Sequence, residues 1–168
     1  MKPWTWDVDA CLTGLLWTLP PVAALVYARS SSWRPIANFQ RLMEMRVRPL
    51  FATLSIPHLL ILSAAAGFGE ELLFRGLLQP LLIVVFDMFE TRPGVAWAVI
   101  GLTSLAFGAL HALSPVYFVL ATVMSVYLGW LMLRTENLAV PILVHALYDA
   151  VALIWLCKAD SPERTSGE

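Results

Sequence analysis

Charged residues are scarce in this chain. Only 14% of its 168 residues are Asp, Glu, Lys or Arg, whereas 59% are hydrophobic, and the mean hydropathy is +0.73. A soluble domain of this size has about 25% charged and about 45–50% apolar residues. The composition therefore excludes an ordinary soluble domain and predicts an integral membrane protein. The formal net charge of -1 gives no reason to expect a nucleic-acid partner.

Cysteine is nearly absent as well. The chain has two, Cys11 and Cys157, and both lie in apolar surroundings. Two such residues cannot form a disulfide framework, and their spacing is not that of metal ligands. We interpret both as small apolar packing residues.

Long apolar stretches dominate what is present. A transmembrane helix needs about 20 apolar residues, and six stretches approach that length. They are Ala10–Ala28, Leu50–Ala66, Glu71–Phe89, Val95–Ala112, Val116–Leu133 and Leu138–Cys157. We therefore expect an all-α, polytopic transmembrane bundle of about six spans with a polar cavity inside it. Residues 1–168 would form a single membrane domain, with a disordered polar tail over 158–168.

The stretch Arg29–Pro49 is rich in arginine. It has five arginines against one acid, Glu44, and "IANFQRLMEMRV" places Ile36, Phe39 and Met43 at helical spacing. Such a pattern fits an interfacial amphipathic helix on an anionic leaflet or a plain cytoplasmic loop. Under either interpretation, the positive-inside rule places it in the cytoplasm.

Alternation of six spans then fixes the expected topology. Arg92 and Arg134 would join Arg29–Pro49 on the cytoplasmic side, and both termini would lie outside. Glu70 and His111 would lie towards the outer face.

The segment "GFGEELLFRG" puts three charges into this apolar sequence, where each costs at least about 2.5–3.5 kcal/mol at mid-bilayer. The i, i+4 spacing of Glu71 and Arg75 predicts an ion pair on one helix face. Glu70 is rotated from Glu71 by about 100° and has no such partner. We interpret Gly67 and Gly69 as opening a helix, whose N-terminus would stabilise the Glu70 carboxylate as a general base. The alternative is a purely structural cluster of three charges.

Two further segments place histidine at i, i+4 spacing. "FGALH" pairs Phe107 with His111, and "HALYD" pairs His145 with Asp149. Buried polar groups in lipid must find polar partners, so we expect these segments to converge with Glu70 on one site. A glutamate beside a histidine can activate water, and a second polar group can stabilise an oxyanion, as amide hydrolysis requires. A single histidine at a helix end, such as His111, is more often an interfacial residue than a catalytic one.

These three motifs resemble the signatures of the CAAX-processing and bacteriocin-processing (CPBP) intramembrane proteases, the family of the eukaryotic type II CAAX prenyl endopeptidase. The family signatures are EExxxR, FxxxH and HxxxN or HxxxD, and here they read EELLFR, FGALH and HALYD. The resemblance covers roughly Ala64–Ile154. Its specificity comes from three motifs in order, each in an apolar stretch.

The resemblance implies an all-helical membrane bundle with a water-filled cavity, in which Glu70 and His111 activate water. It also implies an oxyanion site formed by His145 and Asp149. The residues implied to support the site are Glu71, Arg75 and Phe107.

Asp149 stands where better-studied members of the family carry asparagine. An ionised aspartate cannot donate a hydrogen bond to an oxyanion. A protonated aspartate in a dry site can donate, and an ionised one can accept the ring N–H of His145 and orient it. We favour the orienting role.

Metal dependence is a separate question, since the family is often described as metalloproteases. Glu70, His111 and His145 have the chemistry of a three-ligand zinc site with an open position. The chain has no HExxH motif, however, and the three ligands would come from separate helices. The resemblance favours a metal-free glutamate mechanism, so we expect no cofactor, with zinc at these residues left open. His58 matches none of the motifs, and we expect it to form a hydrogen bond between helices.

The expected function is that of an intramembrane endopeptidase in a bacterial cytoplasmic membrane, with the lipid bilayer and a membrane-anchored protein or peptide as its partners. Small bacterial members resemble enzymes that process peptide precursors or C-terminal sorting signals. One alternative is a non-catalytic peptide-binding or bacteriocin-immunity protein of the same fold. A second is a proton or ion conduit. The intact motif set argues against the first, and the nearly apolar inner half of the spans argues against the second.

Overall fold

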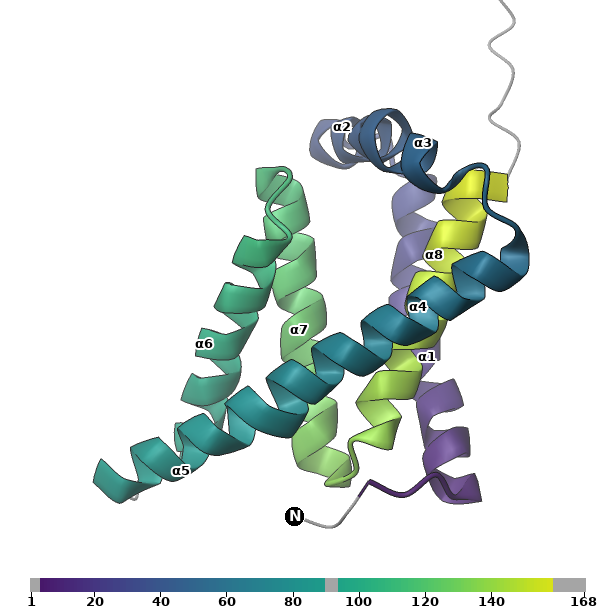
Figure 1. The fold of residues 1–168 in the computed structure, drawn as a ribbon. Coiled ribbons are helices and arrows are strands. Elements are labelled where there is room, and N and C mark those ends of the chain that lie inside the picture. The colour runs from purple at the N-terminus through teal and green to yellow at the C-terminus, as the bar shows by residue number, and fades with distance from the viewer. Residues whose placement is uncertain (1–3, 90–93, 159–168) are drawn as a thin grey trace, which may run out of the picture.

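The computed structural model describes residues 4–89 and 94–158, and every regular element within these ranges is a helix. In chain order the helices are α1 (Val8–Arg29), α2 (Arg34–Leu42), the π-helical η1 (Met43–Val47), α3 (Arg48–Phe51), α4 (Ile56–Glu71), the π-helical η2 (Leu72–Leu78), α5 (Gln79–Phe89), α6 (Val95–Leu110), α7 (Pro115–Thr135) and α8 (Ala139–Lys158). Figure 1 shows α6 and α7 as a hairpin on one side and α1 beside α8 on the other. The expected all-α helix bundle is confirmed.

The surface is apolar, and the interior holds both apolar and polar side chains. Large apolar side chains lie outside, for example Leu16 and Val123, each 61% exposed. The interior packs apolar residues such as Leu59, Ile100 and Leu128 beside buried polar ones, which include Ser63, Glu71, Arg75, Gln79, Thr103, Ser104, Ser125 and His145. Lipid surrounds such a bundle favourably, because apolar side chains lose nothing by facing lipid tails, whereas polar groups must be satisfied inside.

Within the described ranges, three helices are long and apolar enough to cross a bilayer, namely α1, α7 and α8. A fourth span is counted if Arg34–Phe51 and Ile56–Asp87, which meet at 108°, are taken as one bent pair. The apolar helix α6 has 16 residues. At about 1.5 Å per residue it is shorter than the hydrocarbon core of about 30 Å.

The second and third expected spans, Leu50–Ala66 and Glu71–Phe89, are not separate elements. The helices α4, η2 and α5 follow one another without a break, and they cross the bundle obliquely in Figure 1. Glu70 therefore lies in the middle of one long helix. The prediction that a helix begins at Glu70 is wrong, and no helix N-terminus stabilises its carboxylate.

Gly67 has a different role from the one expected. It is buried in α4, and a Cβ placed there would lie 2.8 Å from the backbone nitrogen of Ala146 in α8. A Cβ on Gly69 would meet nothing within 4 Å. Gly67 thus lets α4 approach the α8 backbone closely, one residue away from His145, instead of opening a helix.

Because two expected spans form one continuous helix, the residues that follow lie at the opposite end of the bundle from the one expected. Tyr117, near the start of α7, packs against Phe39 of α2 at a ring-centroid distance of 5.5 Å and against His111 at 5.9 Å. His111 therefore lies at the same end of the bundle as Arg29–Pro49. The expectation that it lies at the opposite face is wrong, because one crossing fewer separates the two segments.

The opposite end carries the turn between α7 and α8. Asn137 Nδ2 donates to the backbone oxygen of Thr5 over 2.9 Å there, while Lys158 Nζ donates to Ala52 O over 3.0 Å at the arginine-rich end. Arg134 therefore lies away from Arg29–Pro49, contrary to expectation. The first and last described residues also lie at opposite ends of the bundle, whereas the expected topology puts both termini on the same side. Arg92 and the tail beyond Lys158 lie outside the described residues.

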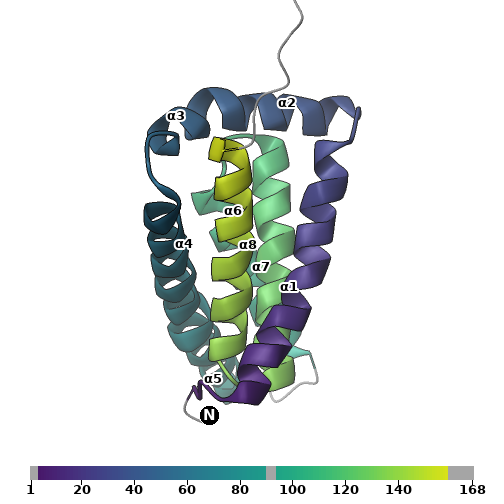
Figure 2. The ribbon, with the colours of Figure 1, turned by 90° about the vertical axis from the view of Figure 1, so that its right-hand side faces the viewer.

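The arginine-rich segment is helical and not a plain loop. α2, η1 and α3 lie across the ends of the other helices, as Figure 2 shows. Phe39 points inward, while Arg34, Arg41 and Arg46 are exposed. The arrangement agrees with the interfacial amphipathic helix and places it over the end of the bundle that holds His111.

His58 differs from its expected role. It is exposed near the start of α4, and its Nδ1 lies 2.7 Å from the Ser55 hydroxyl oxygen. This contact is local to the beginning of the helix, so the expected bond between helices is absent among the described residues.

Candidate active site

Glu70 and Glu71 are adjacent in α4 but face different surroundings. The Glu71 side chain is fully buried, and its Oε1 accepts a hydrogen bond from Arg75 Nη1 over 2.8 Å. The Glu70 side chain is 34% exposed and lines a cavity. The predicted ion pair between Glu71 and Arg75 is confirmed, and Glu70 is the carboxylate that faces the cavity.

Glu71 does more than neutralise Arg75. The same Oε1 atom accepts a hydrogen bond from Nδ1 of His145 in α8, also over 2.8 Å. Arg75 in turn donates from Nη2 to the backbone oxygen of Ser125 over 2.5 Å and to its hydroxyl oxygen over 2.7 Å. A buried polar layer therefore joins α4, η2, α7 and α8. Sequence analysis missed Ser125, whose only signal is that it is a polar residue in an apolar stretch.

His111 ends α6 and is held by the motif that contains it. Its Nδ1 lies 2.8 Å from the Phe107 carbonyl oxygen. A carbonyl can only accept, so Nδ1 carries the proton and donates. The Phe107 ring stacks on the imidazole with centroids 4.4 Å apart. These two contacts turn His111 Nε2 towards Glu70, whose Oε2 lies 3.8 Å away.

His145 is oriented in a similar way from the other side. Because its Nδ1 donates to Glu71, its Nε2 is the atom that faces the cavity. That nitrogen lies 3.9 Å from Glu70 Oε2 and 3.5 Å from Asp149 Oδ2. Glu71 makes the shorter contact with the ring, and Asp149 lies beside the nitrogen that would face a substrate. The orienting role of Asp149 stays a prediction, and Glu71 is a second carboxylate that can orient His145.

Phe107 is the apolar side of the site. Its ring is buried and packs edge-on against Phe74 with centroids 5.1 Å apart. The Arg75 guanidinium lies 5.5 Å from its centroid, and the His145 ring 6.2 Å. Phe107 thus contacts both imidazoles and the buried cation, which explains in packing terms why a large aromatic ring stands there.

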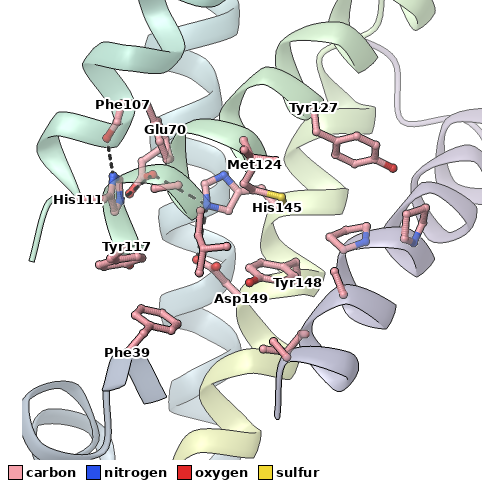
Figure 3. Close-up of a pocket in the computed structure, with 18 residues that line it drawn as sticks. Phe39, Glu70, Phe107, His111, Tyr117, Met124, Tyr127, His145, Tyr148 and Asp149 are labelled. Carbon is pink, nitrogen blue, oxygen red and sulfur yellow. Dashed lines mark hydrogen bonds and ion pairs between the residues drawn. The ribbon is translucent and has the colours of Figure 1, made fainter. Parts of the chain in front are cut away.

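The cavity has a volume of about 350 Å³ and a polar end formed by Glu70, His111, His145 and Asp149. In Figure 3 the Glu70 carboxylate lies between the two imidazole rings. The structure thus brings all four predicted catalytic residues to one cavity. No sequence motif assigns the other lining residues to the site, and they include Pro20, Pro21, Phe39, Tyr117, Met124, Tyr127 and Tyr148.

The two prolines line the cavity without ending α1. Pro21 has no N–H, so the Trp17 carbonyl four residues earlier loses its helical donor. The Tyr127 hydroxyl of α7 donates to that carbonyl oxygen over 2.6 Å. α1 therefore continues from Val8 to Arg29, and a hydrogen bond between helices satisfies the Trp17 carbonyl.

Zinc binding depends on how these donor atoms are arranged. Among the described residues, no group of three His, Cys, Asp or Glu side chains is arranged to hold a metal. His145 Nε2 and His111 Nε2 lie 3.9 and 3.8 Å from the same atom, Glu70 Oε2. We derive no step through a metal, and the metal-free mechanism stays a prediction.

Comparison with known proteins agrees with the motifs. Residues 52–151 match the model of the family described as type II CAAX prenyl endopeptidase Rce1-like. Over 107 residues the chain is 37% identical to an uncharacterized protein, YpbD, of Bacillus subtilis (strain 168), and the alignment covers 62% of this chain and 48% of that protein. The chain therefore spans about half the length of this curated relative. No solved structure matches it.

Proposed function

Because the chain belongs to the type II CAAX prenyl endopeptidase Rce1-like family, we propose that it is an intramembrane endopeptidase. It is an integral membrane protein, and the reaction we assign to it is hydrolysis of a peptide bond in a membrane-associated protein or peptide. The observation that carries the proposal is the position of one partly exposed carboxylate, Glu70, between the imidazoles of His111 and His145.

The proposed nucleophile is a water molecule held by Glu70 and His111. With the Nδ1 proton of His111 donated to Phe107 O, its Nε2 has a lone pair to accept from water. The Glu70 carboxylate accepts the second proton and removes it as the water oxygen attacks the peptide carbonyl carbon. The proton then passes to the amine nitrogen as the C–N bond breaks.

The proposed role of His145 is to stabilise the oxyanion. Its Nε2 faces two carboxylates, Glu70 and Asp149, at 3.9 and 3.5 Å. A lone pair there would be repelled by both, so we assign a proton to Nε2 as well as to Nδ1. The resulting N–H bond can donate to the oxygen that becomes negative in the tetrahedral intermediate.

The buried layer supports this geometry. Glu71 fixes the His145 ring through Nδ1, and Arg75 and Ser125 fix Glu71. A histidine oriented by a buried carboxylate presents its other nitrogen in one direction, which is the condition for preorganised catalysis. Phe107 keeps both imidazoles in place by packing.

The proposed substrate is anchored in the membrane and reaches the site through its apolar cavity. Apart from the polar end, the cavity is lined by apolar residues of α1 and α7 such as Leu25, Leu120 and Met124. We assign the enzyme to a bacterial cytoplasmic membrane. Peptide precursors and proteins with a C-terminal membrane anchor have the required chemistry.

The test is cleavage by wild type and by Glu70→Gln in cells that lack the native enzyme. Mass spectrometry of membrane proteins would identify termini that form only with wild type, and cleavage of the corresponding peptide would be repeated with purified protein in liposomes. Glu44→Gln, an exposed carboxylate far along the chain from the motifs, is the matched control. We expect Glu70→Gln to abolish cleavage and Glu44→Gln to retain it.

The same test separates the enzyme from a binding protein. A non-catalytic peptide-binding or immunity protein would keep its phenotype with Gln at position 70, because the amide has nearly the shape of the carboxyl group. Cleavage that persists in Glu70→Gln would refute the mechanism.

A further inference from the structure

Tyr117 is a cavity residue that the proposed mechanism leaves unused. It lies in the first turn of α7, where the Ser114 hydroxyl accepts from its backbone N–H over 3.1 Å. Its ring is held between Phe39, at 5.5 Å, and His111, at 5.9 Å and nearly perpendicular. Figure 3 shows Tyr117 between these two side chains, on the His111 side of the cavity. The ring is therefore held beside His111, to which the proposed mechanism assigns the nucleophilic water.

The oxyanion has one donor in the mechanism so far, the Nε2–H of His145. Oxyanion sites usually direct more than one donor at the developing charge. Asp149 stands where the second donor is expected, but an ionised carboxylate only accepts hydrogen bonds. Its Oδ2 lies 3.5 Å from His145 Nε2, so it competes for that proton instead of adding another. The site therefore needs a neutral or cationic donor from elsewhere.

Three tyrosines line the cavity, and they differ in what their hydroxyls do. The Tyr127 hydroxyl is committed to the Trp17 carbonyl. The Tyr117 hydroxyl makes no hydrogen bond within the described residues, and its side chain lines the same cavity as Glu70 and Asp149. Tyr148 is next to Asp149 on α8 and has no ring contact with His111. Tyr117 is thus the cavity phenol that packs against His111 and whose hydroxyl makes no hydrogen bond within the described residues.

We propose that Tyr117 is a further catalytic residue, whose hydroxyl donates a hydrogen bond to the oxyanion together with His145 Nε2–H. The inference rests on the proposed function. When the water oxygen bonds to the carbonyl carbon, the electron pair of the C=O bond moves to oxygen, and the phenol stabilises it there. When the C–N bond breaks, the pair returns and the hydrogen bond weakens. The phenol keeps its proton throughout.

The chain itself offers a rescue experiment. In Asp149→Asn the side-chain amide can donate, which the carboxylate cannot. If Tyr117 supplies the missing donor, asparagine at position 149 should replace part of its contribution. The informative set is therefore Tyr117→Phe, Tyr148→Phe, Asp149→Asn and the double variant Tyr117→Phe with Asp149→Asn.

The experiment measures kcat and KM in liposomes with a quenched fluorescent peptide that contains the cleavage sequence found with wild type. We expect Tyr117→Phe to lower kcat about 10²–10³-fold, the loss typical of one oxyanion donor, with KM within about twofold. Tyr148→Phe should stay within about threefold of wild type. The double variant should cleave at least tenfold faster than Tyr117→Phe alone. Thermal unfolding checks that all four variants fold.

Each outcome has one meaning. A wild type that cleaves nothing refutes the proposed function itself. A cleaving wild type with an equally active Tyr117→Phe refutes only the role of Tyr117, and so does a loss that lies in KM, or a larger loss in Tyr148→Phe. If Tyr117→Phe does not fold, a second measurement still tests the inference. It compares the affinity of wild type and of Asp149→Asn for a peptide aldehyde. Tighter binding by Asp149→Asn supports a site with too few donors, and equal or weaker binding overturns the inference.

Discussion

Glu71 Oε1 and His145 Nδ1 are 2.8 Å apart, and this hydrogen bond joins α4 to α8 across 74 residues of sequence. Because of this hydrogen bond, the adjacent residues Glu70 and Glu71 have different roles. Glu71 is at once the partner of the buried Arg75 and the group that fixes the direction of a histidine in the cavity. Glu70 makes no such bond, and its Oε2 atom is buried without a hydrogen-bond partner among the described residues.

The two glutamates should therefore respond in opposite ways to loss of charge. We expect Glu71→Gln to destabilise the protein by about 3–5 kcal/mol, because it leaves Arg75 buried without a counter-ion. Glu70→Gln removes a carboxylate whose Oε2 makes no hydrogen bond among the described residues and whose imidazole neighbours are no closer than 3.8 Å, so it should leave stability unchanged or raise it. Thermal unfolding in detergent micelles measures both. Equal stability of the two variants would contradict this assignment.

Gly67 and Gly69 form a second matched pair. A Cβ at Gly67 would lie 2.8 Å from Ala146 N and 3.0 Å from its Cα, so Gly67→Ala must push α4 away from α8 beside the Glu71–His145 bond. We expect a loss of about 1–3 kcal/mol from overpacking, in spite of the better helix propensity of alanine. A Cβ at Gly69 would meet nothing within 4 Å, so Gly69→Ala should be tolerated.

Cleavage assays would extend the glycine comparison. Gly67→Ala should lose activity along with stability, since the displaced helix carries Glu70. If Gly67→Ala is as stable and active as Gly69→Ala, the close approach of α4 and α8 does not hold the site together.

Much of the site could be predicted from sequence because its signals are local. The i, i+4 spacing identified the Glu71–Arg75 pair, and the rotation of Glu70 from Glu71 identified the carboxylate in the cavity. Ser125 and Tyr117 could not be found, because a serine or tyrosine in an apolar helix has no local feature that says which residue it meets. Their roles depend on how α7 packs against the long helix.

The topology failed for a similar reason. Apolar length gives the number of stretches, but it cannot tell whether two neighbouring stretches are joined. The glycines between Leu50–Ala66 and Glu71–Phe89 predict that one helix ends and another begins there. In the structure Gly67 packs against Ala146, and tertiary contact keeps the helix continuous.

Tyr127 should stabilise α1 through the carbonyl that Pro21 leaves without a donor. We expect Tyr127→Phe to cost about 1–3 kcal/mol, since the part-buried Trp17 carbonyl would lose its hydrogen-bond donor. In a Pro21→Ala background the backbone N–H returns, so the same Tyr127→Phe change should cost much less. A double-mutant cycle by thermal unfolding measures this coupling, and strictly additive effects would disprove it.

Chelation tests the metal-free mechanism directly. We expect cleavage in liposomes to survive dialysis against a strong chelator, and elemental analysis to find less than about a tenth of an equivalent of zinc. The reason is that no group of three His, Cys, Asp or Glu side chains among the described residues is arranged to hold a metal. Activity that is lost on dialysis and restored by added zinc would require a different arrangement of these ligands.

Orientation in the membrane decides which side of the bilayer the site serves. The basic residues at the α2 end of the bundle are Arg29, Arg34, Arg41, Arg46, Arg48 and Lys158, whereas Arg134 is the basic residue at the other end of the described chain. The positive-inside rule places the richer end in the cytoplasm. His111 lies at that end, so we expect the cavity to open towards the cytoplasmic half of the bilayer.

Cysteine labelling tests this orientation in a background with Cys11 and Cys157 replaced by alanine. Ser32→Cys and Leu113→Cys, both at exposed positions of the α2 end, should react with an impermeant maleimide only in inverted vesicles, and Arg134→Cys only in intact spheroplasts. Reaction of Ser32→Cys and Leu113→Cys from opposite sides would contradict the continuous α4–η2–α5 helix, because a break there adds a crossing. Reaction of both from outside would leave the fold intact and reverse the orientation alone.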